Sequence, residues 1–333
     1  MPDQHPVICV VRTPLQLFNV IEACQRFYDD SVAKHLIIVA GSAIDLRMMQ
    51  DMLCAEQGWQ TVHTVIFQGW RKHLYGWQLN RFLHGLGEVQ AVLIGMITHV
   101  PLHVVNMVKP KQVWIIDDGN ESLMLARQMA AWREHPPTRS ASIRDHLFGL
   151  KLNPLGVKHA TFFSVFDLKG TMPQLDNDYR CFKQCATHLP IRPDVLVIGS
   201  NLVGTYIKCA EVLLQRLKQL NQQLLPDVPR WYAPHRYESE QHLTEIEALG
   251  YQLYRPDCIL EYTQIQQGWC FSATYSIRST AVDTLEKIYN ITGYLVALPQ
   301  ADFVSQAKWQ ECQHIWQQHP NLLSLPDQDD VLS

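Results

Sequence analysis

The stretch from residue 113 to residue 122, VWIIDDGNES, constrains the fold more than any other part of the sequence. Its apolar run, Val113 to Ile116, has the length and composition of a buried strand. The run ends in two carboxylates and in Gly119, which allows a sharp turn. Asn120 or Ser122 can then cap a following helix. Because open α/β sheets bind ligands at the carboxyl ends of their strands, this carboxylate pair is placed for chemistry.

Strand and helix signals alternate on both sides of this stretch. Apolar runs predict strands at residues 7–11, 35–40, 62–67 and 89–96, and helices are predicted at 13–23, 43–56 and 102–108. Such alternation is typical of a mostly parallel sheet with helices on both faces. We therefore expect residues 1–150 to form a Rossmann-like domain.

The alternation weakens between residues 135 and 193, where proline, glycine and polar residues surround one strand-like run at 160–166. It resumes with predicted strands at 194–198, 230–233, 251–254, 258–262, 269–271 and 293–298. Helices are predicted at 204–220, 239–249, 276–289 and 303–317. We place the domain change in the weak region and expect a second Rossmann-like domain at residues 151–333.

Length and charge limit the classes of protein that need to be considered. A chain of 333 residues suffices for two domains, and its net charge of -4 offers no basic field to a nucleic acid. None of its nine cysteines forms a C-x-x-C pair, so we expect reduced thiols and a cytoplasmic location. The sequence lacks a signal-peptide pattern and any apolar run long enough to span a membrane. Contact with a membrane is therefore expected only at its surface.

Five signals stand at predicted strand ends: Thr13-Pro14-Leu15-Gln16, Asp117-Asp118-Gly119, Gly199-Ser200-Asn201, Pro234-His235-Arg236 and Phe271-Ser272-Ala273-Thr274. Their order resembles the bacterial sialyltransferases, especially the lipooligosaccharide sialyltransferase and polysialyltransferase families. Those families share an Asp/Glu-Asp-Gly motif, a later His-Pro motif and a still later Ser-Ser/Thr motif. The resemblance extends to about residue 290. It departs in two places, because arginine follows His235 and because Ala273 separates the two hydroxyl residues.

The resemblance implies a GT-B fold, in which two Rossmann-like domains face each other across a cleft. It implies an inverting glycosyltransferase that moves sialic acid or a related nonulosonic acid from its CMP-activated form to a hydroxyl of a surface glycan, such as lipooligosaccharide, O-antigen or capsule. The N-terminal domain would hold the glycan or glycolipid acceptor, and the C-terminal domain would hold the CMP-sugar. The last helix would cross back to the first domain. We also consider peripheral contact with the inner membrane and a homodimer.

The same resemblance assigns two catalytic residues. Asp117 would be the base that removes the proton of the acceptor hydroxyl, which a carboxylate within hydrogen-bond reach can do. Asp118 would orient this base or cap the helix. His235 would donate to the phosphate of the leaving group, where negative charge grows during transfer. Because CMP carries a single phosphate, we expect no requirement for a metal.

The other candidate residues would bind the substrates. Ser272 and Thr274, at the expected start of a helix, suit the phosphate of the donor. Glu261 stands where the families place an acid near the nucleotide base or ribose. The full set of substrate-binding candidates is Thr13, Gln16, Asp118, Gly119, Gly199, Ser200, Asn201, Glu261, Ser272 and Thr274.

Each assignment has a structural alternative. Asp118, Thr13 and Ser272 can be simple helix caps. Glu261 can be a solvated charge, and the stretch 70–82 can be either a buried amphipathic helix or a membrane-surface contact. Two other functions also remain open. One is metal-dependent phosphoryl transfer by Asp117 and Asp118. The other is a non-catalytic glycan-binding or nucleotide-binding protein of the same fold.

Overall fold

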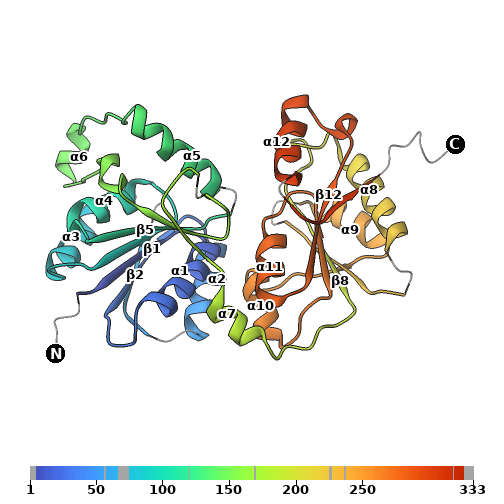
Figure 1. Ribbon diagram of the computed structural model, residues 1–333, viewed down its shortest axis with the longest axis horizontal. Coiled ribbons are helices and arrows are strands. Elements are labelled where there is room, and N and C mark those ends of the chain that lie inside the picture. Colours follow the sequence, from blue (N-terminus) through green and yellow to red (C-terminus); the bar gives the residue numbers. More distant parts are fainter. Residues whose placement is uncertain are drawn as a thin grey trace. The chain divides into compact units, whose positions relative to one another are not determined.

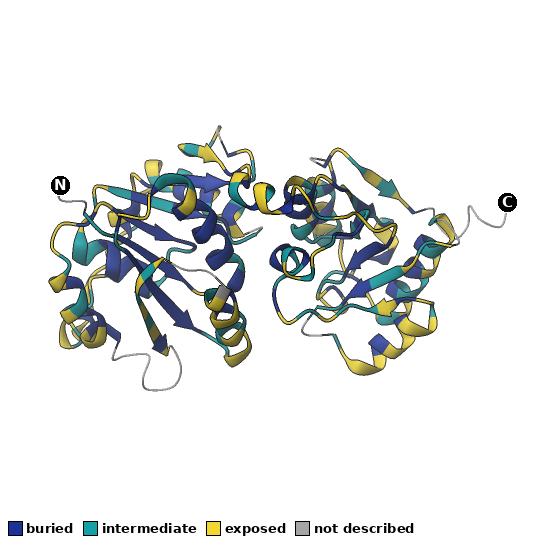
Figure 2. Ribbon diagram, turned by 90° about the horizontal axis from the view of Figure 1, so that it is seen from below, coloured by how far each residue is buried: buried dark blue, intermediate teal, exposed yellow. Residues whose placement is uncertain are grey.

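The computed structural model describes residues 5–55, 58–66, 75–119, 121–168, 170–224, 227–235, 238–317 and 319–325. The chain divides into two compact units, residues 1–182 and 183–333. Each unit contains its own parallel sheet with helices packed around it (Figure 1). In both units the strands are largely buried, and the exposed residues gather on the outer faces of the helices (Figure 2).

The sheet of the first unit has the strand order β3-β2-β1-β4-β5-β6-β7, and all its described pairings are parallel. Its strands are β1 Val7–Val11, β2 Lys34–Ala40, β3 Trp59–Ile66, β4 Ala91–Ile94, β5 Gln112–Ile116, β6 Thr161–Ser164 and β7 Gln174–Asp176. Its helices are α1 Pro14–Phe27, α2 Ala43–Ala55, α3 Tyr75–Gly85, α4 His99–Val108, α5 Glu121–Glu134, α6 Ile143–Leu147 and the 3-10 turn Pro154–Val157. The strand order reverses between β1 and β4, which is where open α/β sheets bind ligands.

The sequence explains the apolar character of this sheet. Every residue of β1 and β2 is buried, as expected for central parallel strands covered on both faces. Helix α1 begins directly after β1 because Thr13 caps it and Pro14 occupies its first turn, where a missing amide proton costs nothing. This short connection places the first residues of α1 at the carboxyl edge of the sheet.

The second unit repeats the plan with the strand order β10-β9-β8-β11-β12-β13. Its strands are β8 Val195–Ile198, β9 Arg230–Ala233, β10 Gln252–Leu253, β11 Ala273–Ser276, β12 Thr292–Ala297 and β13 Leu322–Ser324. Its helices are α8 Ala210–Gln223, α9 Glu240–Ala248, α10 Leu260–Gln267, α11 Ala281–Tyr289, the 3-10 turn Gln300–Asp302 and α12 Gln306–Trp316, while α7 Arg180–Ala186 spans the boundary between the units. Again the order reverses, here between β8 and β11, and all described pairings are parallel.

The domain boundary differs from the expected one. The structure places it after residue 182, later than the predicted change at 150/151. The reason is that β6 and β7 pair with the first sheet although the sequence around them is irregular. Helix α12, expected to cross back to the first domain, packs on β12 of its own unit and donates the Trp316 indole N–H to the Ile277 carbonyl at 2.8 Å.

Several predicted elements also change. Residues 258–262, predicted as a strand, lead into and begin helix α10, and 269–271 precede β11 instead of forming a strand. The helices predicted from 204 and 276 begin only at Ala210 and Ala281. Of the stretch 70–82, residues 70–74 lie outside the described residues. The remainder belongs to α3, whose buried side chains confirm an amphipathic helix.

Candidate active site

Asp117 follows β5 and is 2% exposed. One carboxylate oxygen accepts a hydrogen bond from the Ser164 hydroxyl and the other from the Val165 amide, both at 2.6 Å. Its backbone carbonyl accepts a bond from the Asn19 side chain at 3.2 Å. Asp117 therefore ties the end of β5 to the end of β6. This placement departs from the expected one, because a catalytic base must present its carboxylate to a substrate and Asp117 is turned into the fold.

Asp118, and not Asp117, places its carboxylate at the carboxyl edge of the sheet, where the catalytic base was expected. Its carboxylate is half-buried and accepts hydrogen bonds from the Thr13 hydroxyl at 2.9 Å and from the Gln16 amide at 2.7 Å. Burial raises the pKa of Asp118, although these two bonds and the nearby Arg12 charge lower it in part. The backbone amide of Asp118 donates to the Ser122 hydroxyl at 2.9 Å. The result is a fixed carboxylate with increased proton affinity at the carboxyl edge of the sheet.

Gln16 organises this site. Its side-chain oxygen accepts the Arg12 backbone amide at 2.8 Å, while its nitrogen binds Asp118. The side chain lies so close to Gly95 that a Cβ atom there would be 2.2 Å from the Gln16 Cδ atom. A larger residue at that position would displace the Gln16 side chain. The structure thus brings together two residues that the sequence suggested, Thr13 and Gln16, with Asp118.

The turn after Asp118 follows the sequence prediction in one respect and departs from it in another. Gly119 adopts a positive φ of 64°, the left-handed conformation that favours glycine. Ser122 lies inside the first turn of α5 and accepts the Asp118 amide, so it does not cap the helix as suggested. Asn120, the other suggested cap, lies outside the described residues.

In the second unit, Gly199 and His235 lie at the carboxyl edge of the sheet, after β8 and β9. The Gly199 amide donates to the Ala233 carbonyl at 2.8 Å, and a Cβ atom at Gly199 would be 2.7 Å from the Tyr232 hydroxyl. Glu238 accepts the backbone amide of His235 at 2.8 Å and the Tyr232 hydroxyl at 2.7 Å. The half-buried carboxylate of Glu238 thus holds the backbone of the half-buried His235.

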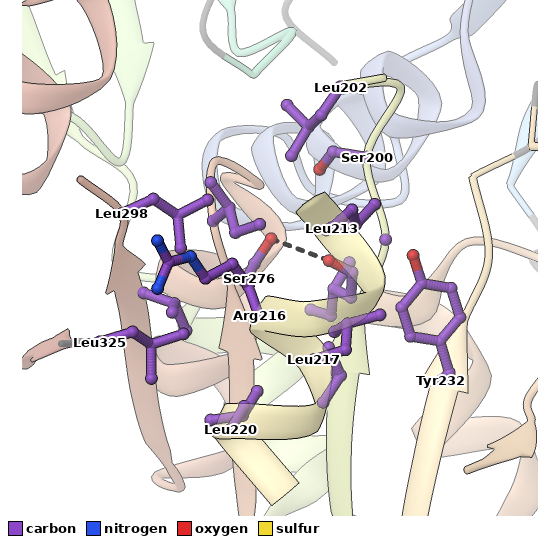
Figure 3. Close-up of a pocket in the computed structure, with 15 residues that line it drawn as sticks. Ser200, Leu202, Leu213, Arg216, Leu217, Leu220, Tyr232, Ser276, Leu298 and Leu325 are labelled. Carbon is purple, nitrogen blue, oxygen red and sulfur yellow. Dashed lines mark hydrogen bonds between the residues drawn. The ribbon is translucent and has the colours of Figure 1, made fainter. Parts of the chain in front are cut away.

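Beside Gly199, helix α8 covers the sheet and leaves a small apolar cavity (Figure 3). Leu213 and Leu217 line it, and Ser200 and Tyr232 stand at its border. Its volume of about 20 Å³ is enough for one water molecule. It is therefore a packing gap and is too small for a nucleotide. Asn201 is exposed beyond it.

The structure corrects the placement of Ser272 and Thr274. Ser272 precedes β11, and its hydroxyl donates to the Asp194 carbonyl at 3.0 Å, just before β8 begins. It therefore lies at the amino edge of the sheet, opposite the edge where ligands bind. Thr274 lies within β11 and is fully buried between the neighbouring strands. Neither residue stands at the start of a helix.

The hydroxyl groups at the carboxyl edge come from later residues. Ser276 ends β11, donates to the Ile198 carbonyl at 2.9 Å (Figure 3) and accepts the Ser279 amide at 3.1 Å. Ser279 and Thr280 directly precede α11 and are half-buried. Arg278 lies beside them, with its guanidinium carbon 4.4 Å from the centre of the Tyr206 ring. Arg278, Ser279 and Thr280 were not among the residues predicted from the sequence, although Ser279 and Thr280 are two consecutive hydroxyl residues.

Glu261 also lies elsewhere than expected. It is in the first turn of α10 and is 5% exposed. Burial raises the pKa of Glu261 to about 7. Its backbone carbonyl accepts the Tyr289 hydroxyl at 2.5 Å. This environment is that of a buried core carboxyl group and differs from the predicted strand-end position.

Within the residues that the structure describes, no group of three or more histidine, cysteine, aspartate or glutamate side chains is arranged to hold a metal ion. In that same part of the chain, no helix is both long and apolar enough to cross a membrane.

Comparison with known proteins identifies the fold. No protein-family model matches the chain, and no curated protein sequence is similar to it. UDP-GlcNAc 2-epimerase from Methanocaldococcus jannaschii superimposes with a TM-score of 0.51 and 9% identity, covering 95% of this chain and 93% of that one. Phytolacca americana UGT2, complexed with UDP-2fluoro-glucose and pterostilbene, gives a TM-score of 0.51 and 11% identity, covering 99% and 88%. At such identities the likeness establishes the fold alone, two Rossmann-like domains of the GT-B class, and confirms the predicted fold class.

Proposed function

We propose that the chain is a glycosyltransferase that moves a sugar from a nucleotide-activated donor to a hydroxyl of a glycan acceptor. The observation that carries this proposal is the carboxylate of Asp118, held by Thr13 and Gln16 at the reversal point of the first sheet. The fold adds support, because it is shared with Phytolacca americana UGT2, a structure that holds a nucleotide sugar together with a second small molecule.

In this proposal Asp118 is the catalytic base. Transfer to a hydroxyl requires that its proton be removed as the new bond forms, and a carboxylate within hydrogen-bond reach performs that step. A carboxylate with a raised pKa accepts a proton more readily than an ordinary one. Asp117 would act as a positioning residue, because its bonds to Ser164 and Val165 fix the strand end from which Asp118 projects.

The second unit would stabilise the leaving nucleotide. Negative charge grows on a phosphate oxygen as the glycosidic bond to the nucleotide breaks, so fixed donors near that oxygen lower the barrier. Arg278, Ser279 and Thr280 stand at the amino end of α11, where helix amides also favour an anion. His235 lies after β9 at the same edge of this sheet and would add a further donor.

For the donor we propose a CMP-activated nonulosonic acid. The support is the order of the motifs along the chain, to which Ser279-Thr280 now contributes the consecutive hydroxyl pair that Ser272 and Thr274 lacked. A CMP leaving group carries a single phosphate. Hydrogen-bond donors of the chain can therefore stabilise the charge of this phosphate, and we propose transfer without a divalent metal.

The test is a panel of CMP-, UDP-, ADP- and GDP-sugars, each incubated with galactoside acceptors while nucleotide release is measured. We expect acceptor-dependent release of CMP from CMP-sialic acid, unchanged by EDTA and strongly reduced in Asp118→Asn. Release of UDP or ADP instead would overturn the assignment of a CMP-sugar as donor, but it would support the proposed glycosyltransferase activity. Absence of release from every donor, with a folded protein, would refute the transferase itself.

A further inference from the structure

A pocket of about 290 Å³ lies at the carboxyl edge of the first sheet. Its apolar wall is formed by Val39 at the end of β2 and by Ile97, Val100 and Leu102 around the start of α4. Its polar lining consists of Arg12, Thr98, His99 and Arg139. Two arginines and a histidine over an apolar wall form a lining of mixed character.

The side chains around the pocket carry more positive than negative charge. Arg139 contacts the buried Asp145 at 3.2 Å, and Arg144 lies 3.8 Å from the same carboxylate. Two arginines therefore share one carboxylate. Arg12 is exposed, and its guanidinium has no ion pair within the described residues. Burial and the two nearby arginines lower the pKa of His99, so the ring is neutral near pH 7 and can donate or accept a hydrogen bond.

The pocket adjoins Asp118. Gln16 joins the two sites, because its side chain accepts the Arg12 amide and donates to Asp118. Gly95 packs against the same side chain and stands two residues before Ile97 of the pocket wall. A ligand seated against Arg12 would therefore lie beside the residues that hold Asp118, and the charge of Arg12 already acts on that carboxylate.

We propose that this pocket binds an anionic group of the acceptor, a carboxylate or a phosphate, and thereby directs a neighbouring hydroxyl to Asp118. The inference rests on the proposed function and names its acceptor class, an acidic glycan. Guanidinium groups bind both anions through paired hydrogen bonds. The apolar wall would contact the carbon face of the sugar ring that carries the anion.

The experiment uses three sugars that differ only at C6: galactose, galacturonic acid and galactose 6-phosphate. Binding to the full chain is titrated by calorimetry at low and at high salt. We expect at least one acidic sugar to bind about tenfold more tightly than galactose, the equivalent of one charge-assisted hydrogen bond. The advantage should shrink at high salt. Comparison of the two acids identifies the anion that the pocket prefers.

The variants locate the binding. Arg12→Gln should abolish the preference for the acidic sugar, and Arg139→Gln should weaken it. The matched control is Arg47→Gln, an arginine of the same unit with an 82% exposed side chain, which should preserve the preference. Because Arg139 also contacts the capping residue Asp145, Arg12→Gln is the decisive variant.

Equal binding of the three sugars would overturn the inference. So would a preference that survives Arg12→Gln, or one that disappears in Arg278→Gln instead, since the anion would then be held in the second unit. Nucleotide release is measured on the same preparations. If the preference for the acidic sugar is lost in Arg12→Gln but no nucleotide is released from any sugar donor, the anion pocket is supported and the glycosyltransferase activity is refuted. Failure of the pocket and failure of the proposed function can therefore be distinguished.

Discussion

The two units each contain a carboxyl group whose pKa is raised by burial, and the two groups differ in what surrounds them. Asp118 in the first unit is half-buried at the edge of the sheet and is held by Thr13 and Gln16. Glu261 in the second unit is 5% exposed within the first turn of α10. Increased proton affinity alone therefore does not mark a catalytic group. Access to a ligand separates a carboxylate that can exchange a proton with substrate from one whose ionisation affects only the fold.

The largest expected effect is that of Asp118→Asn on transfer. The amide keeps the shape of the side chain and removes the proton acceptor. Positioned acid–base catalysis contributes about 10²–10⁴-fold, so the rate of transfer should fall by about that factor. The measurement is acceptor-dependent nucleotide release, with the melting temperature recorded to show that the fold is retained. Transfer at the wild-type rate in this variant would remove Asp118 from the mechanism.

Glu261→Gln should act on stability and its pH dependence. Burial raises the pKa of Glu261 from 4.5 to about 7, so the folded state binds this proton more tightly than the unfolded state. The resulting stability is fully present below pH 4.5 and is lost as the pH rises to about 7. The difference amounts to about 3 kcal/mol. Glutamine stays neutral, so the variant should lack this component.

The measurement is denaturant unfolding of the wild type and Glu261→Gln at pH 5 and pH 8. The control is Glu247→Gln, which changes an exposed glutamate of α9 in the same unit and should behave like the wild type. If the pH dependence of Glu261→Gln equals that of Glu247→Gln, Glu261 is ionised normally and the contrast between the two units fails. Transfer should change little in either variant.

Asp117→Asn should separate the two neighbouring carboxylates. The amide can still bond to Ser164 and Val165, but both bonds lose the negative charge that strengthens them. We expect a loss of about 2 kcal/mol in the free energy of unfolding and a rate of transfer within about tenfold of the wild type. If Asp117→Asn instead abolishes transfer while Asp118→Asn preserves it, the first carboxylate is the base after all.

The sequence predicts the fold well wherever apolar runs are long. The run at 7–11 coincides with β1, and the run at 35–40 lies within β2 Lys34–Ala40. Prediction fails where the pattern is short or ambiguous. β7 has three residues that are at most half-buried, so it carries no apolar signal. The run at 258–262 enters a helix that turns Tyr262 and Gln264 inward, and a short apolar run cannot distinguish that from a strand.

The candidate site is predictable in part for a related reason. The sequence locates the carboxylate pair, but it does not show which member is buried. That depends on Ser164, which is 47 residues away and reaches Asp117 through the pairing of β5 with β6. The misplacement of Ser272 has the same origin. Its position is decided by where β11 starts beside β8, and a single sequence does not show that register.

The smallest expected effect is that of Thr13→Ala, and it tests the coupling between the fold and the base. Thr13 caps α1 and donates a hydrogen bond to Asp118. Loss of the cap should cost about 1 kcal/mol of stability. Loss of the bond to the carboxylate should raise the pKa of Asp118 further, because that bond favours the ionised form.

Since the base acts only when ionised, the acidic limb of the pH profile of kcat/KM should move to higher pH in Thr13→Ala. At alkaline pH, where Asp118 is fully ionised, the rate should approach that of the wild type. Thr13→Ser retains the hydroxyl and should restore both the stability and the profile. A loss of stability without any movement of the acidic limb would mean that Thr13 is only a helix cap. A limb that moves to lower pH would show that the ionisation controlling the rate belongs to a group other than Asp118.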